Sequence, residues 1–423
     1  MVHARFCVYF QHEIKRKYKG EGPELYIMLF FTNVAVQETQ ITSDKSLTPL
    51  FVILTSIAAL GLSFGIHALI VGHDHVFGTS REVPWGLLIT PYVFFACLST
   101  GLCIISSLGQ VFGIKTFVPL VNRAVFLSII SMAAGLIAIG LEIENPWRMV
   151  FYGIISPNPN SNIWWKSSIY TLFILLMIFN FLFLLLRQKR IARGLGIGAL
   201  IAITCGNLNM NSDMALLGSR GFWAENYMPL FFLIMSTLLA CCCLTLFVWL
   251  SSRLHNRTID NETRSSIAAI SKLTVLLLLG ALAFGTLKIL GGFSTQFTKN
   301  PLAMQVLVQG DFALKFWIGE IFLTSILPLF LLIFCKQGDK IGMCALACLS
   351  SIIGVFITFY NLIIVGQLVP HYQAYELYDV PSYYSYSPSL HEAMMTTGVV
   401  FFFFAAFVLG EILLNSASAR ERT

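Results

Sequence analysis

Long apolar runs alternate with short polar connections along most of this chain. Ten runs come close to the roughly 20 residues that a helix needs to cross the hydrocarbon of a bilayer. They comprise residues 49–71, 87–112, 117–140, 165–186, 195–205, 227–250, 267–290, 312–334, 341–365 and 393–414. We expect the fifth run to be broken at Cys205, Gly206 and Asn207. Barrel strands would be about half as long and would alternate polar with apolar residues, which these runs do not.

Composition supports a membrane class. Of the 423 residues, 57% are hydrophobic and only 11% are charged, whereas a soluble domain carries about a quarter of its residues charged. The pattern therefore predicts an all-α polytopic membrane protein with about ten transmembrane helices. Nucleic acid is not an expected partner, because the basic residues are spread over the connections and form no patch.

Basic residues collect in alternate connections. They are Lys15, Arg16, Lys17 and Lys19 before the first run, Arg187, Lys189, Arg190 and Arg193, then Arg253, Arg257 and Arg264, then Lys336 and Lys340, and Arg420 and Arg422 at the end. The positive-inside rule places these connections and both termini in the cytoplasm. The chain then divides into a cytoplasmic segment 1–48 without an assigned role, a transmembrane domain 49–415 and a cytoplasmic tail 416–423. The expected location is the bacterial inner membrane.

Cysteine and histidine usage argues against a resident cofactor. No Cys-x-x-Cys pattern occurs among the ten cysteines, and the consecutive Cys241, Cys242 and Cys243 would point in different directions on a helix. A transmembrane haem usually needs two facing axial ligands, but His67 is the single histidine well inside a run. We expect no haem, iron–sulfur cluster or metal ion held by this chain.

Charges inside spans are costly and tend to be functional. His67, Lys288 and Glu320 are such positions. We expect Glu320 either to pair with Lys288 or Lys315 or to belong to a proton path, and we assign Glu320 and Lys288 to that path. For His67 the alternatives are contact with a ligand and a hydrogen-bonded structural role.

One outward connection, between the third and fourth runs, carries unusual chemistry. Glu142 and Arg148 follow the third run, and Trp164 and Trp165 open the fourth. An acid that accepts protons, an arginine that holds an anion and a flat aromatic cleft suit a small redox molecule arriving from lipid. The simpler alternative is that the charges end two helices and the tryptophans anchor them at the headgroups.

From about Pro49 to the end, the chain carries a set of ordered motifs. They are Val83-Pro84-Trp85-Gly86-Leu87, Ser99-Thr100-Gly101, Glu142-x-x-x-Pro146-Trp147-Arg148, Ser161-Asn162-Ile163-Trp164-Trp165, Tyr227-Met228-Pro229, Phe316-Trp317-Ile318-Gly319-Glu320 and Tyr386-Ser387-Pro388-Ser389-Leu390-His391-Glu392. Taken in order, these motifs resemble those of the NrfD-like integral membrane subunits, in particular the ten-helix, hydrogenase-type branch. The resemblance implies two four-helix bundles plus two further helices, with no cofactor in the chain. It also implies electron exchange between menaquinone or ubiquinone and an extracytoplasmic iron–sulfur (ferredoxin-like) subunit. In such complexes a molybdopterin, hydrogenase or multihaem cytochrome subunit completes the assembly.

The resemblance places quinone contacts at the outward end of the first bundle, where Trp85, Tyr92 and Glu142 stand. Glu142 is the expected catalytic acid, because quinol oxidation releases protons that a nearby carboxylate must accept. To Trp85 and Tyr92 we add His67, Arg148 and Trp165 as expected quinone-binding residues.

The outward connections 142–165 and 367–392 are poor in lysine and rich in aromatic residues, which favours docking of the iron–sulfur partner there. Two other functions fit the same pattern. A secondary transporter would use helices broken at midplane, such as the one expected near Cys205. A non-catalytic anchor of soluble redox subunits would need no quinone site at all.

Overall fold

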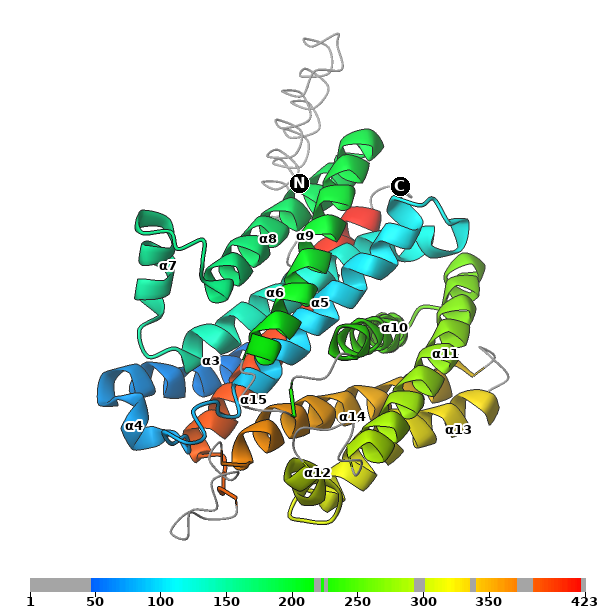
Figure 1. Ribbon diagram of the computed structural model, residues 1–423. Coiled ribbons are helices and arrows are strands. Elements are labelled where there is room, and N and C mark those ends of the chain that lie inside the picture. The colour runs from blue at the N-terminus through cyan, green and yellow to red at the C-terminus, as the bar shows by residue number, and fades with distance from the viewer. Residues whose placement is uncertain are drawn as a thin grey trace. The chain divides into compact units, whose positions relative to one another are not determined.

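The computed structural model describes residues 47–216, 222–223, 227–292, 301–334, 340–370 and 383–419. In these ranges the chain is helical and contains no strand, so the predicted all-α class is confirmed (Figure 1). The predicted segment 1–48 lies almost wholly outside the described residues. The predicted tail 416–423 begins within the last helix, which continues to Ala419.

Ten helical stretches of the described part are long and apolar enough to cross a membrane, as the sequence predicts. They are α3 (Thr48–Val71), α5 (Ile89–Gln110), η2 (Lys115–Leu120) continued by α6 (Val121–Glu142), α8 (Asn162–Leu185), α9 (Lys189–Leu216), α10 (Met228–Leu254), α11 (Asn261–Gly292), η3 (Lys315–Ile326) continued by α13 (Leu327–Phe334), α14 (Ile341–Leu368) and α15 (Leu390–Ala419). Three short helices lie in the connections: α4 (His73–Val76), α7 (Pro146–Ile155) and α12 (Pro301–Val308).

Four helices form what we call the first helix group: α5, α6, α8 and α9. They pack in a ring, with α5 against α6, α6 against α8, α8 against α9, and α9 against α5. Small polar residues let α5 and α6 approach closely, because Ser99 Oγ donates to the Ser128 carbonyl at 2.8 Å and Ser128 Oγ donates to the Ser99 carbonyl at 2.9 Å. Such pairs are typical of helix contacts inside membranes.

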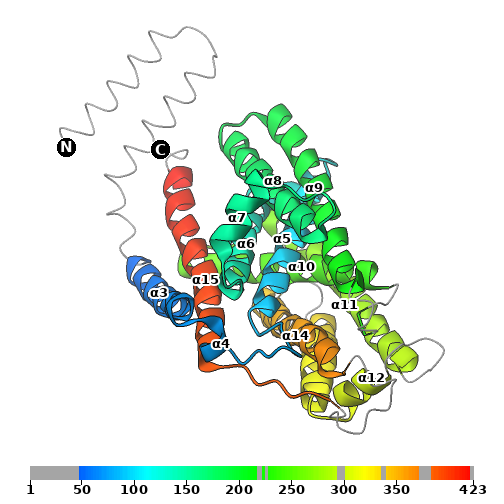
Figure 2. The same cartoon turned by 60° about the vertical axis from the view of Figure 1, so that its left-hand side comes forward.

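The second helix group consists of α10, α11, η3–α13 and α14. These also pack in a ring, and α10 links the two groups through α5 (Figures 1 and 2). At the link, a Cβ on Gly101 would collide with the backbone carbonyl of Ser236, so glycine permits the close approach of α5 and α10. These contacts are compatible with the two four-helix bundles that the resemblance implies.

The predicted break in the fifth span is wrong. Helix α9 runs without interruption through Cys205, Gly206 and Asn207. Gly206 is needed for packing, since a Cβ there would come within 2.6 Å of the Tyr170 ring on α8. Asn207 is buried and its side-chain amide donates to Ser236 Oγ on α10 at 3.3 Å. The neighbouring helices thus accommodate the residues that resemble a break in the sequence.

By its contacts the chain divides into two compact units. The larger unit, Ile57–Phe403, contains both helix groups. The described part of the smaller unit consists of the first residues of α3 and the last residues of α15. All residues discussed below belong to the larger unit.

Candidate functional site

A cavity of about 420 Å³ lies inside the first helix group, at the end where α5 and α8 begin and α6 ends. Its volume falls in the range of small-molecule sites in proteins. The short helix α7, which contacts α8, contributes Met149 (Figure 2). The described lining residues are Pro84, Trp85, Ile89, Tyr92, Val93, Leu136, Ile139, Glu142, Ile143, Met149, Ile163, Lys166, Ser167, Tyr170, Met210 and Met214. The cavity therefore brings together three predicted residues, Trp85, Tyr92 and Glu142.

Glu142 is the last residue of α6, and Ile143 after it is extended. One carboxylate oxygen, Oε1, accepts a hydrogen bond from the Gly86 backbone N–H at 3.0 Å. The other oxygen, Oε2, is buried and has no hydrogen-bond partner among the described residues. A buried polar atom of this kind is costly unless something pairs with it. Oε2 can accept a hydrogen bond from a hydroxyl group that enters the cavity.

The segment Trp85–Gly86–Leu87 lies just before α5. Hydrogen bonds donated by its three consecutive backbone N–H groups hold it in place. The Trp85 N–H donates to Gln367 Oε1 of α14 at 2.9 Å, and Gln367 Nε2 donates back to the Trp85 carbonyl at 3.0 Å. The Leu87 N–H is shared between Tyr386 Oη at 2.7 Å and Glu392 Oε1 at 3.0 Å. Backbone N–H groups outside a helix need other partners, and Gln367, Glu142 and Glu392 with Tyr386 supply them here. The tethers fix the Gly86 N–H, which donates to Glu142.

Glu392 is the centre of this arrangement, although it was not among the site residues expected from the sequence. Its buried carboxylate also accepts from the N–H groups of Gly78 at 2.9 Å and Ser389 at 2.8 Å and from Tyr386 Oη at 2.5 Å. The Glu392 N–H returns a bond to Ser389 Oγ at 3.2 Å. This is a capping box, and the spacing Ser389-x-x-Glu392 is its sequence signal.

Tyr386 stays a hydrogen-bond donor in this site. Burial of the ring, reinforced by the negative charge of Glu392, raises the pKa of the Tyr386 phenol above its ordinary value. The phenol therefore remains protonated at neutral pH. Glu392 also lies near enough to Glu142 for the two carboxylates to interact electrostatically.

Aromatic side chains form much of the cavity wall. Trp85 stacks on Trp223, with ring centroids 5.0 Å apart and an interplanar angle of 20°, and Trp223 Nε1 donates to the Leu362 carbonyl at 2.8 Å. Two buried tyrosines, Tyr92 on α5 and Tyr170 on α8, bring their phenol groups together. The sequence did not predict Tyr170 as a cavity residue. It lies one helical turn after Lys166, which also lines the cavity.

Comparison with known proteins bears on the family of this chain. The family described as "Polysulphide reductase, NrfD" matches residues 75–371, which is more than half of the chain and includes the whole cavity. The chain belongs to the NrfD family. The predicted resemblance is thus confirmed, and this NrfD chain is an integral, multi-pass membrane protein.

Two relatives of this NrfD chain have names that bear on its role. A selenate reductase subunit of Mesobacillus selenatarsenatis is 24% identical over 360 residues, covering 75% of this chain and 82% of the relative. The "Hdr-like menaquinol oxidoreductase integral membrane subunit" of Archaeoglobus fulgidus is 23% identical over 388 residues, covering 89% of this chain and 95% of the relative. Each name describes one subunit of a larger enzyme.

Three other residues predicted for the NrfD quinone site are not among the described residues that line the cavity. His67 lies on α3, and its Nδ1 is 3.1 Å from Nε2 of His391. This contact corresponds to the hydrogen-bonded role that we gave as the alternative to ligand contact. Trp165 is 46% exposed and its Nε1 donates to the Pro159 carbonyl at 2.8 Å. Arg148 is exposed on α7, the helix that contributes Met149 to the cavity.

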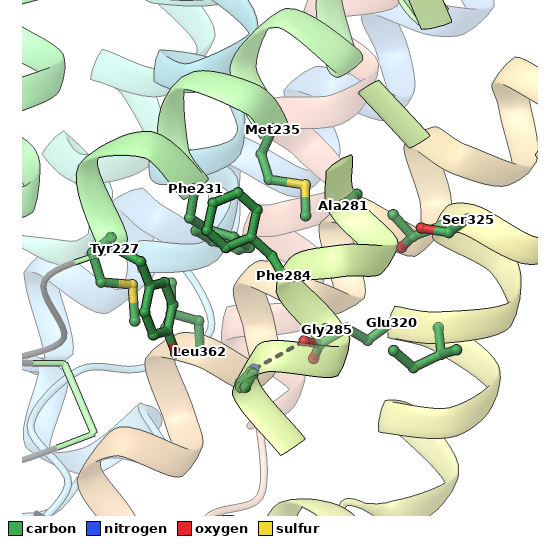
Figure 3. A pocket seen from close by; sticks show the side chains of 13 residues that line it. Tyr227, Phe231, Met235, Ala281, Phe284, Gly285, Glu320, Ser325 and Leu362 are labelled. Carbon is green, nitrogen blue, oxygen red and sulfur yellow. Dashed lines mark hydrogen bonds and ion pairs between the residues drawn. The ribbon is translucent and has the colours of Figure 1, made fainter. Parts of the chain in front are cut away.

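The second helix group of this NrfD protein holds the remaining predicted pair. Lys288 Nζ on α11 lies 2.9 Å from Glu320 Oε1 on η3, and both side chains are buried, at 10% and 6% exposure (Figure 3). Asn361 Nδ2 of α14 donates to Glu320 Oε2 at 3.3 Å. The sequence allowed Glu320 to pair with Lys288 or Lys315, and in the structure it pairs with Lys288.

Glu320 lies in an unusual stretch of helix. The residues Lys315–Ile326 have π-helical hydrogen bonding, which often marks functional positions. Beside the ion pair is a pocket of about 20 Å³, the size of one water molecule, lined in part by Thr324 and Ser325. The lining residues of this pocket and those of the larger cavity form separate sets.

Within the described part of this NrfD chain, no three side chains of histidine, cysteine, aspartate or glutamate converge.

Proposed function

We propose that this chain is the quinone-reacting membrane subunit of a multisubunit respiratory oxidoreductase. It exchanges electrons between the menaquinone or ubiquinone pool and an extracytoplasmic iron–sulfur subunit. The observation that carries the proposal is the cavity of about 420 Å³ with the unpartnered Glu142 Oε2 at its wall. The relative from A. fulgidus, named as a menaquinol oxidoreductase subunit, supports the same substrate class.

The residues of the cavity suit a quinol that arrives from lipid. Its ring is flat and apolar, and the wall offers the stacked Trp85 together with Ile89, Ile139 and Met210. Its hydroxyl group can donate to Glu142 Oε2, and the Gly86 N–H keeps the carboxylate in place for this contact. Oxidation of the quinol releases two protons and two electrons. Glu142 would accept one proton as a general base, and the second would leave to water at the outward end of the cavity. The iron–sulfur cluster of the partner subunit would take the two electrons, which is chemistry that this chain does not supply.

We place Lys288 and Glu320 on a proton path through the second helix group. A paired lysine and glutamate inside a span are expensive to keep and usually serve a function. Thr324 lies beside the ion pair, and its Oγ1 is 3.4 Å from Thr358 Oγ1. The hydroxyl groups of these two threonines would extend the proton path beyond the ion pair. The ion pair alone would also fit a purely structural role.

We propose that the connection containing α7 and the one before α15 face outward and dock the iron–sulfur subunit. Trp147 and Tyr152 of α7 are 72% and 61% exposed, and Tyr383 is 48% exposed. Aromatic residues of this kind favour interfaces. Part of the second connection, residues 371–382, lies outside the described residues. Both termini would then be cytoplasmic, in the inner membrane of a bacterial cell.

The test is titration of the purified complex with a fluorescent hydroxyquinoline N-oxide, a quinone analogue whose emission is quenched on binding. We expect one saturable site, and competition by added menaquinone or ubiquinone. A complex that assembles and turns over yet binds no analogue would instead be anchored by a non-catalytic subunit. The transporter alternative loses one of its supports, since α9 is continuous where a broken helix was expected.

A further inference from the structure

Lys166 lines the cavity from α8, and nothing in the sequence pattern drew attention to it. Helix α8 begins at Asn162, so Lys166 lies about one turn inside the span. It shares a face of the helix with Tyr170, four residues later, which also lines the cavity. Lysine within a transmembrane span is rare, because the charged group is costly in hydrocarbon.

A lysine near a helix end often extends to the headgroups, which would be the ordinary explanation for Lys166. Its neighbour Trp165 is 46% exposed and is not among the described residues that line the cavity. Lys166 itself is only half-buried, yet it contributes to the wall of the cavity together with Ser167. Lys166 therefore lines the interior of the first helix group.

Charge in the cavity is confined to two positions. Among the described residues that line it, Glu142 on α6 and Lys166 on α8 are the charged ones. A carboxylate only accepts hydrogen bonds, whereas an ammonium group only donates them. Most of the other lining side chains are apolar, with Ser167 and the two tyrosines as the exceptions.

This donor and acceptor match the chemistry of a para-quinone ring. Such a ring carries oxygen atoms on opposite sides, and in the oxidised form both are acceptors. In the reduced form each hydroxyl both donates and accepts, so one oxygen can donate to Glu142 while the opposite oxygen accepts from a donor in either form. An ammonium group stabilises a negatively charged oxygen better than a neutral donor does.

We propose that Lys166 is a quinone-binding residue, which donates a hydrogen bond to the ring oxygen opposite the one that faces Glu142. The inference rests on the proposed function of the cavity. The ring then spans the cavity from α6 to α8, with Trp85 of the segment before α5 and Met210 of α9 along its faces. Tyr170 lies about 6 Å deeper along α8, at 1.5 Å of rise per residue, and closes the inner end.

The experiment measures binding of the fluorescent hydroxyquinoline N-oxide to the intact complex, because that probe also carries oxygen atoms on opposite sides of its ring. We expect Lys166→Met to weaken binding by about tenfold or more, as for loss of one hydrogen bond from a charged donor. Lys166→Arg, which keeps the charge, should bind within about fivefold of the wild type. The matched control is Lys115→Met, at an exposed lysine of η2 far from the cavity lining.

Turnover separates binding from damage to the fold. Lys166→Met should raise KM for quinol, and Lys166→Arg should restore it, whereas a merely structural lysine would show no such rescue. If Lys166→Met fails to assemble, Lys166→Gln is measured against the same thresholds. Wild-type affinity in the assembled neutral variants would overturn the assignment of Lys166 while leaving the quinone site intact. Absence of probe binding in the wild type would overturn both that assignment and the proposed function.

Discussion

At the scale of single residues, Glu142 has two oxygen atoms with different tasks. Oε1 holds the Gly86 N–H, and Oε2 is the buried atom without a described partner. Replacement by glutamine keeps an oxygen for Gly86 but removes the proton acceptor. We therefore expect Glu142→Gln to lower quinol turnover about 10²-fold while the complex still assembles, as for removal of a general base.

The measurement for Glu142 is the rate of quinol oxidation by purified complex with equal subunit content. Glu144→Gln is the matched control, since Glu144 lies two residues further on and is exposed. It should leave turnover unchanged. Full turnover in an assembled Glu142→Gln complex would show that another group accepts the proton.

Residues of the cavity differ in how far the sequence could identify them. Trp85, Tyr92 and Glu142 followed from the family resemblance, and the structure brings them into one cavity. Lys166 could not be recognised in this way, because a lysine directly after two tryptophans looks like a headgroup anchor. Glu392 carried a readable signal, its capping box, but its bonds to Gly78 and Leu87 join segments about 300 residues apart. Sequence spacing holds no information on such distant contacts.

At the scale of helices, the ten spans were predictable because the length of an apolar run is set by the bilayer itself. The continuity of α9 was not, since a glycine and two asparagines resemble a break when their neighbours are unknown. In the structure Gly206 faces the Tyr170 ring, and Asn209 exchanges hydrogen bonds with Asn162 of α8, the shortest at 2.6 Å. Packing against α8 and α10 thus decides what the local sequence leaves open.

The contact at Gly206 gives a prediction for α8 and α9. Gly206→Ala would place a methyl group about where the Tyr170 ring now lies, so the two helices or the ring must shift. Overpacking of this kind typically costs about 1–3 kcal/mol. We expect a lower midpoint of thermal unfolding and weaker binding of the quinone analogue, because Tyr170 lines the cavity.

Gly198→Ala is the control on the same helix. A Cβ there would have its nearest neighbour, Leu176 Cδ1, at an ordinary 3.5 Å. Alanine also has a higher helix propensity than glycine, so this variant should unfold at the same temperature or a higher one. Equal behaviour of the two variants would contradict the close packing of α8 and α9 at Gly206.

The Lys288–Glu320 pair joins α11 to η3, and its energetics bear on how to interpret it. Removing one partner from a buried pair leaves an uncompensated charge, which usually costs about 3–5 kcal/mol, whereas an apolar replacement of both is often neutral. Loss of stability in a single variant would therefore not by itself indicate a proton path. Only proton uptake measured in a stable double replacement addresses that role.

At the scale of the whole molecule, orientation in the membrane connects the separate proposals. Because basic residues collect in the other connections, we expect the cavity end of the first helix group to face outward. That end is also where an extracytoplasmic iron–sulfur subunit could reach the quinone. The sequence predicts this orientation from charge alone, so a direct measurement of sidedness tests the docking proposal at its base.

Single cysteines at Asn158 and Tyr383, both exposed in the two proposed outward connections, supply that measurement. We expect a membrane-impermeant maleimide to label them in intact cells. A cysteine at the exposed Thr258, in a proposed cytoplasmic connection, should react only after the membrane is opened. Crosslinkers attached at Asn158 and Tyr383 should then capture an iron–sulfur protein, because aromatic outward surfaces beside a quinone site fit such a partner. Labelling of Thr258→Cys from outside would reverse the topology, and capture of lipid alone would remove the docking surface while leaving the cavity and its chemistry in place.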